Sequence, residues 1–129
     1  MKKTVKVVAA IIINEHDEVL CALRSPQMSL PNYWEFPGGK VETHERIEEA
    51  IVREIFEELN CTITANQRFN EHTHEYDHIF VNLITVLCTL QEGTPTANEH
   101  AKLRWVPRSK LKELNWAPAD IPAVCELMK

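Results

Sequence analysis

The segment Arg53-Glu54-Ile55-Phe56-Glu57-Glu58 constrains this chain more than any other part of it. On a helix that advances about 100° per residue, Glu54, Glu57 and Glu58 fall within one narrow arc. Like charges at this spacing repel by roughly 0.2–0.5 kcal/mol per pair, so a helix built only for stability would avoid them. The pattern therefore predicts a positive partner at this face, and clustered carboxylate oxygens favour a hard divalent cation.

The residues on either side predict the bounds of this helix. Thr43 is suited to the N-cap position, and we expect a helix from about Glu45 to Leu59 that ends at Asn60 in a left-handed conformation. One broad side of the helix is apolar and is expected to face the core: Ile47, Ile51, Val52, Ile55, Phe56 and Leu59. The glutamates border this side, which places them at the edge of the packed interior.

The rest of the chain has the pattern of a single α+β domain over residues 1–129. Strands are expected at 5–13, 19–24, 61–68, 79–90 and 103–106, and a second helix at 119–128. The first strand is almost entirely apolar, which is typical of a strand covered on both faces, and the second is expected to return beside it as a hairpin. This order of elements predicts an α/β/α sandwich with a mixed β-sheet.

Composition and charge narrow the class of partner. The net charge of −5 argues against binding to a nucleic-acid polymer, which needs a basic face, so a phosphate ligand would have to be attracted by local cations. Four scattered cysteines favour a reducing cytoplasm, and the apolar run near the N-terminus is far too short to span a membrane. We expect a monomer or a homodimer that binds a small molecule.

Two glycines and an arginine complete the candidate cation site. A backbone carbonyl at Gly38-Gly39 could join the glutamate oxygens around Mg²⁺, which prefers octahedral oxygen ligands. Such a metal neutralises phosphate charge and lowers the pKa of bound water. Arg53 stands four residues before Glu57, the spacing of a helical ion pair, so it can hold that carboxylate in one orientation.

These residues match a known pattern. The stretch Gly39-(five residues)-Glu45-(seven residues)-Arg53-Glu54-Ile55-Phe56-Glu57-Glu58-Leu59-Asn60-Cys61 resembles the Nudix box of hydrolases that act on nucleoside diphosphate linkages. Its one departure is Asn60, where the family usually has glycine, and asparagine accepts the same helix-ending conformation. The resemblance implies the Nudix fold with a catalytic loop-helix-loop, and an attack of water on phosphorus that depends on Mg²⁺, for which Mn²⁺ can substitute.

The resemblance also implies a role for each position of the pattern. The implied metal ligands are Gly38, through its carbonyl, and Glu54, Glu57, Glu58 and Glu99. One of Glu54, Glu57 and Glu99 would help to activate water, with Arg53 as part of the catalytic group. Glu45 would hold Arg53 in place, and Gly39 would support the loop that precedes the helix.

Two further segments point to one branch of the family. The run from Trp34 to Glu42 looks like the MutT-type branch, and Ala-Pro-Ala-Asp-Ile-Pro at 117–122 is similar to the base-pocket segment of MutT-like and CTP pyrophosphohydrolase-like members. This likeness implies hydrolysis of a nucleoside triphosphate to a monophosphate and pyrophosphate, with Arg24, Phe36 and Asp120 at the substrate. An ionised Asp120 only accepts hydrogen bonds, so it would suit the exocyclic amine of cytosine, as in CTP or a damaged cytosine nucleotide, better than an oxidised guanine.

Several alternatives stay open. Arg24 is equally consistent with a surface arginine at a strand end, Asp120 with a first-turn helix acid, and Trp34 and Trp116 with packing rather than base stacking. The histidines at 72, 74 and 78 are typical of a polar hairpin rather than of a zinc site. The competing functions are hydrolysis of another nucleoside diphosphate derivative, such as ADP-ribose, and a Nudix module that binds nucleotides without cleaving them.

Overall fold

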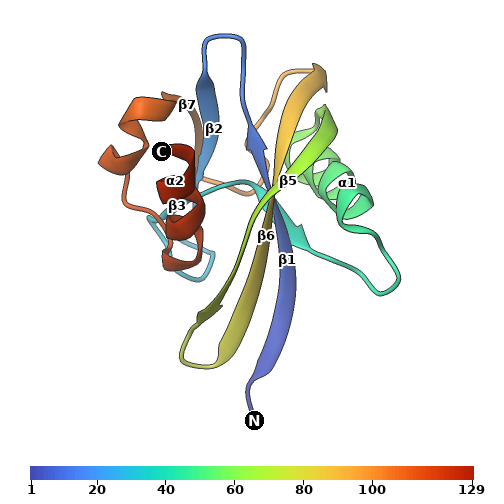
Figure 1. Ribbon diagram of the computed structural model, residues 1–129, viewed down its shortest axis with the longest axis vertical. Helices are drawn as coiled ribbons and strands as arrows, with labels where there is room; N and C mark the ends of the chain where they lie inside the picture. The colour runs from blue at the N-terminus through green and yellow to red at the C-terminus, as the bar shows by residue number, and fades with distance from the viewer.

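The computed structural model describes residues 1–129 and contains two β-sheets with helices on opposite sides (Figure 1). The mixed sheet has the strand order β4-β1-β6-β5, built from Gly38–Lys40, Lys3–Ile12, Ile79–Glu92 and Thr62–Glu75. The antiparallel sheet has the order β3-β2-β7, built from Trp34–Glu35, Glu18–Leu23 and Lys102–Pro107. The helices are α1 (Ile47–Leu59) and α2 (Ile121–Leu127), and α2 follows two 3-10 turns, η1 (Arg108–Glu113) and η2 (Pro118–Asp120). The predicted α+β sandwich with a mixed sheet is confirmed.

Strand β1 carries the core on both of its faces. From Val8 to Ile12 no residue is more than 2% exposed. Successive side chains of a strand point to opposite faces. The even-numbered residues of this segment therefore pack beneath α1, and the odd-numbered residues pack against the second sheet and α2. The covered first strand is confirmed for this half, whereas the residues from Lys3 to Val7 are exposed or half-buried.

Helix α1 begins two residues later than expected, and Thr43 is not its N-cap. His44 has a φ of 67° and cannot belong to a right-handed helix, and Arg46 is extended (φ −78°, ψ 154°), so the first helical residue is Ile47. Arg46 is the N-cap, and its backbone N–H donates to Glu49 Oε1 at 2.9 Å. At the other end Asn60 has φ 56° and ψ 39°, and its N–H donates to the carbonyl of Phe56 at 3.1 Å. The left-handed end at Asn60 is confirmed.

The predicted hairpin between the first two strands is wrong. Strand β1 pairs with β4 and β6, whereas β2 pairs with β3 and β7. The turn between them is closed by an isolated bridge from Ile13 to Val19 and by a hydrogen bond from the Asn14 N–H to the Glu18 carbonyl at 3.0 Å. The chain therefore changes sheets at this turn.

Other element bounds also differ from the expectation. Strands β5 and β6 extend to Glu75 and Glu92, so His72 and His74 belong to a long strand, whereas His78 lies in the connecting turn. The C-terminal helix is replaced at its start by η2, and η1 has no counterpart in the prediction. Phe56 is 57% exposed and does not face the core. No helix has the length and apolar character needed to cross a membrane.

Candidate active site

Arg53 lies at the centre of the acidic face of α1 and joins it to the loop before the helix. Its Nε and Nη2 donate to the two oxygens of Glu45 at 2.7 and 2.9 Å, and its Nη1 donates to Glu54 Oε2 at 2.8 Å and Glu57 Oε1 at 3.1 Å. Nη2 also donates to the carbonyl of Lys40 at 3.1 Å. The hydrogen bonds from Arg53 lower the pKa of Glu45 to about 2, so this carboxylate stays ionised. The repulsion along the helix is thus offset by one guanidinium.

The two glycines before this loop are required by close approach, since neither has a positive φ. A Cβ atom at Gly39 would lie 2.1 Å from Glu54 Oε1, and one at Gly38 would lie 1.9 Å from the carbonyl oxygen of Val8. The absence of a side chain at Gly38 therefore lets strand β4 pair with β1. The absence of a side chain at Gly39 lets the Glu54 carboxylate reach the backbone of β4.

Glu58 is the acid of α1 that turns farthest into the interior. Its Oε2 is one of two buried side-chain polar atoms in the protein that have no hydrogen-bond partner; the other is His100 Nδ1. Burial raises the pKa of Glu58 to about 7, with Glu54, Glu35 and Glu99 adding to the rise and His100 opposing it. An acid that is buried without a partner needs a proton or a cation.

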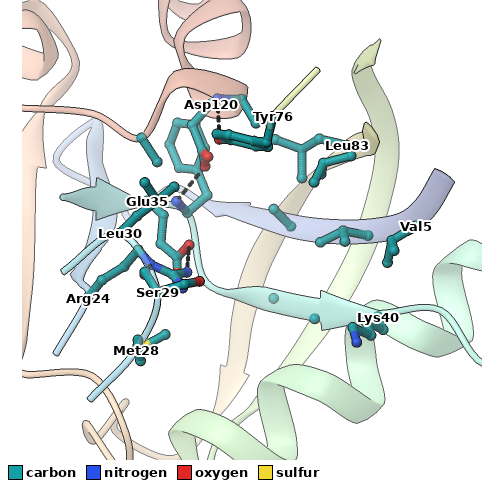
Figure 2. A pocket seen from close by; sticks show the side chains of 18 of the residues that line it. Val5, Arg24, Met28, Ser29, Leu30, Glu35, Lys40, Tyr76, Leu83 and Asp120 are labelled. Atoms are coloured by element: carbon teal, nitrogen blue, oxygen red, sulfur yellow. Dashed lines mark hydrogen bonds and ion pairs between the residues drawn. The ribbon is translucent and has the colours of Figure 1, made fainter. Parts of the chain in front are cut away.

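A cavity of about 640 Å³ opens beside this acidic face and includes Gly38, Gly39 and Glu58 in its wall. Its other walls are largely apolar and come from β1 and β6: Val5, Val7, Ile79, Val81 and Leu83. Figure 2 shows Arg24 and Ser29 at one end of the cavity and Val5 and Lys40 at the other. Its size is in the range of ordinary small-molecule sites.

Asp120 lines the inner part of this cavity and is only 5% exposed. Its Oδ2 accepts a hydrogen bond from the backbone N–H of Phe36 at 3.0 Å, drawn as a dashed line in Figure 2. Burial, together with the charge of Glu35, raises the pKa of Asp120 to about 8. Tyr76 supports the same turn, because its hydroxyl oxygen accepts from the N–H of Ala119 at 3.1 Å. Asp120 is therefore fixed at the cavity wall and holds a proton at neutral pH.

Glu35 and His100 are site residues that the sequence did not single out. Glu35 Oε1 accepts from Arg24 Nη1 at 2.7 Å, and Glu35 Oε2 lies 2.7 Å from His100 Nε2. Arg24 also donates to the carbonyl and the hydroxyl of Ser29. Arg24 thus lies in the cavity wall, as a substrate contact requires. All three of its side-chain nitrogens, however, already donate hydrogen bonds to Ser29 or Glu35.

The whole chain matches one family of proteins. The model of the NUDIX domain matches residues 3–127. The chain belongs to the Nudix family. It is 38% identical over 121 residues to the CTP pyrophosphohydrolase of Escherichia coli, covering 93% of this chain and 88% of that one. It is 30% identical over 127 residues to the 8-oxo-dGTP diphosphatase of the same organism, covering 98% of each.

The same likeness extends to a solved structure. The MutT Nudix hydrolase of methicillin-resistant Staphylococcus aureus 252 superimposes with a TM-score of 0.81 at 48% identity, covering 99% of this chain and 98% of that one. The Nudix fold, the MutT-like relationship and the hydrolase class that the sequence predicted are confirmed.

Nudix hydrolases generally need a divalent metal, and the acidic face of α1 fits such an ion. The buried Oε2 of Glu58 lacks a partner, and a Cβ at Gly39 would occupy the space against Glu54. No three acidic, histidine or cysteine side chains converge on one point, although Arg53 leaves one oxygen of Glu54 and one oxygen of Glu57 free. The donor set therefore has the right chemistry, and side-chain rotation would bring it together.

The remaining predicted site residues lie in three different environments. Glu99 is exposed in the loop before β7 and does not line the cavity, although its charge adds to the raised pKa of Glu58. Phe36 lines the cavity but is 2% exposed, with its ring 4.7 Å from that of Trp116. Trp116 is itself buried and donates from Nε1 to the carbonyl of Leu111 at 2.6 Å, so of the two open roles it has the packing one.

Proposed function

We propose that this protein is a Mg²⁺-dependent nucleoside triphosphate pyrophosphohydrolase, in which Mn²⁺ can replace Mg²⁺. One observation carries the proposal: the unpartnered carboxylate of Glu58 stands in the wall of a cavity of nucleotide size, next to the acidic face that Arg53 holds in order. The E. coli relatives, a CTP pyrophosphohydrolase and an 8-oxo-dGTP diphosphatase, support the substrate class.

In the proposed mechanism the chain's own groups divide the work. Glu54, Glu57, Glu58, Glu99 and the Gly38 carbonyl would hold the metal, which supplies charge neutralisation at the phosphates and a more acidic water. Arg53 keeps Glu54 and Glu57 oriented, and Glu45 keeps Arg53 in place. One of Glu54, Glu57 and Glu99 accepts the proton of the attacking water. The water oxygen bonds to phosphorus, the diphosphate P–O bond breaks, and a monophosphate and pyrophosphate leave.

The proton on Asp120 widens the range of bases that the site accepts. The argument for cytosine assumed an ionised carboxylate, which only accepts hydrogen bonds. Burial favours the neutral acid, and a neutral carboxyl donates from one oxygen and accepts at the other, as an amide does. Because Oδ2 already accepts from Phe36, Oδ1 carries the proton and would donate to an acceptor of the base, such as N3 of cytosine or O6 of an oxidised guanine. We therefore propose both CTP-like substrates and oxidised nucleotides, with Asp120 as the base contact and Arg24 as a phosphate contact.

The decisive experiment is a screen for pyrophosphate release with Mg²⁺ across CTP, dCTP, the other common nucleotides, 8-oxo-dGTP and ADP-ribose. Glu57→Gln should abolish most of the activity, because the amide loses the charge and the proton-accepting capacity. Glu48→Gln is the matched control on the same helix, since Glu48 pairs with Arg68 away from the cavity, and it should keep wild-type rates. If no nucleotide is turned over, or if Glu57→Gln equals wild type, the protein is not the proposed enzyme.

We also propose that the protein is cytoplasmic and that its partner is a small nucleotide. All four cysteines are free and three of them are buried, which supports a reducing cytoplasm. The net charge of −5 supports a small nucleotide rather than a nucleic-acid polymer as the partner.

A further inference from the structure

The loop of residues 93–101, which carries Glu99, is docked on the C-terminal end of α1. The last carbonyls of a helix have no partner within the helix. Thr96 donates to the carbonyl of Leu59 from its N–H at 2.9 Å and from its hydroxyl at 3.3 Å, and Asn98 Nδ2 donates to the carbonyl of Glu57 at 3.2 Å. The residue before Glu99 is therefore fastened to the helix that carries the metal-binding glutamates.

The residue after Glu99, His100, is held by a contact in the protein interior. The side chain of His100 is 2% exposed, and its Nε2 lies 2.7 Å from Glu35 Oε2. A carboxylate only accepts, so Nε2 carries the proton and donates. The other oxygen of Glu35 accepts from Arg24, which also holds Ser29. A partly buried chain of polar groups thus runs from Arg24 in the cavity wall to the neighbour of Glu99.

We propose that Asn98 and His100 are positioning residues that fix Glu99 against the acidic face of α1, and that Glu35 connects this position to the loop held by Arg24. This inference rests on the proposed function, in which Glu99 contacts the metal or the attacking water. Glu99 itself is exposed and makes no hydrogen bond through its side chain, so its neighbours on either side determine where its carboxylate stands.

Stability alone does not explain the buried bridge. Burying charged groups is costly, and replacing a buried ion pair by apolar residues of similar volume is often neutral or stabilising. A bridge from Glu35 to His100 instead fixes one orientation of two chain segments that are 65 residues apart in sequence. Catalysis requires such a fixed orientation, because a misplacement of about 1 Å can reduce a rate roughly a hundred-fold.

The test is a double-mutant cycle with Glu99→Gln. His100→Asn and Asn98→Ala should each lower kcat roughly ten- to a hundred-fold in the wild-type background, with KM for the nucleotide changed less than about two-fold. In the Glu99→Gln background the same substitutions should have little further effect, since they act through Glu99. Asn98 is exposed, so its variant should fold even if His100→Asn does not. Asp17→Asn, which removes a surface pair with Arg108, is the control and should keep the wild-type kcat.

Two outcomes would overturn the inference in an active enzyme: an unchanged kcat in both variants, or reductions that are as large without the Glu99 carboxylate as with it. A second measurement does not depend on activity. The heteronuclear NOE of the Glu99 amide should match that of α1 in the wild type and should fall in Asn98→Ala. An amide that is equally ordered in both proteins would refute the positioning role, whereas an inactive wild type would refute the proposed function instead.

Discussion

Replacing the two adjacent glycines one at a time should separate catalysis from folding. In Gly39→Ala the new Cβ would lie 2.1 Å from Glu54 Oε1, against the 3.4 Å of ordinary van der Waals contact, a shortfall of about 1.3 Å. The atom it meets is the end of a side chain, which can rotate away. In Gly38→Ala the new Cβ would meet backbone atoms, Val8 O at 1.9 Å and Ala9 Cα at 2.7 Å, and the pairing of β4 with β1 leaves these no freedom.

The structure gives the size of each effect. In Gly39→Ala the Glu54 carboxylate loses its 2.8 Å hydrogen bond from Arg53, a charge-assisted bond worth about 1.5–3 kcal/mol. Alanine also reduces the conformational entropy of the unfolded chain, which stabilises the folded protein by about 0.4–1 kcal/mol. The net loss of stability is thus on the order of 1–2 kcal/mol, or roughly 4–8 °C in Tm. The rate should fall about a hundred-fold, because a proposed metal ligand is displaced by more than 1 Å. Gly38→Ala should lose about 3 kcal/mol or more, since strand pairing is broken as well as overpacked.

The assay is thermal unfolding by circular dichroism beside pyrophosphate release at saturating nucleotide. We expect Gly39→Ala to be folded and nearly inactive, and Gly38→Ala to melt at a clearly lower temperature than Gly39→Ala. Wild-type turnover by Gly39→Ala would show that the Glu54 carboxylate is not needed where it stands. Equal melting temperatures for the two variants would show that the contact with Val8 does not support the fold.

Three other perturbations have defined outcomes. The folded-state pKa of Asp120 is about 8, above its ordinary value of 3.8, so the contribution of Asp120 to stability is complete below pH 3.8 and is lost as the pH rises through 8. In chemical denaturation, Asp120→Asn should reduce the dependence of the unfolding free energy on pH and should be a few kcal/mol more stable than wild type at pH 8. An unchanged pH dependence would contradict the buried neutral acid. Mg²⁺ at 100 times its Kd should raise the free energy of unfolding by about 2.7 kcal/mol in the wild type and by much less in Glu58→Gln. Calorimetry with and without EDTA measures this difference, and equal increases in the two proteins would show that Glu58 does not bind the metal. Asn60→Ala should lose about 1 kcal/mol because of its left-handed φ of 56°, and Asn60→Gly should keep wild-type stability within that amount; alanine that is as stable as glycine would refute the capping role.

Features that depend on neighbouring residues in sequence were predictable. The contact of Arg53 with Glu57 follows from a spacing of four residues on a helix, and the helix end at Asn60 follows from the tolerance of asparagine for a left-handed backbone. The start of α1 was missed because Arg46, a good helix former, has an extended backbone with a ψ of 154° instead. No local preference of the sequence indicates that conformation.

Features that depend on distant contacts were not predictable in this way. A turn between two apolar strands is consistent with a hairpin, and only the pairing partners of β1 and β2 show that the chain changes sheets. Glu35 and His100 have no motif around them, since their role arises from a contact between segments that local periodicity does not connect. Asp120 lies in the cavity wall, and its raised pKa depends on burial by distant segments, which no local sequence pattern indicates.

The atoms of the acidic face show how Arg53 and a cation can share the same carboxylates. Arg53 uses both oxygens of Glu45, which leaves that residue as a support for the guanidinium. From Glu54 and Glu57 it takes one oxygen each, Oε2 and Oε1, and leaves Glu54 Oε1 at the backbone of β4 and Glu57 Oε2 without a bond. Together with Glu58 Oε2, each of three glutamates therefore keeps one oxygen that Arg53 does not use. A cation that took these three oxygens could therefore bind without breaking the ion pairs of Arg53.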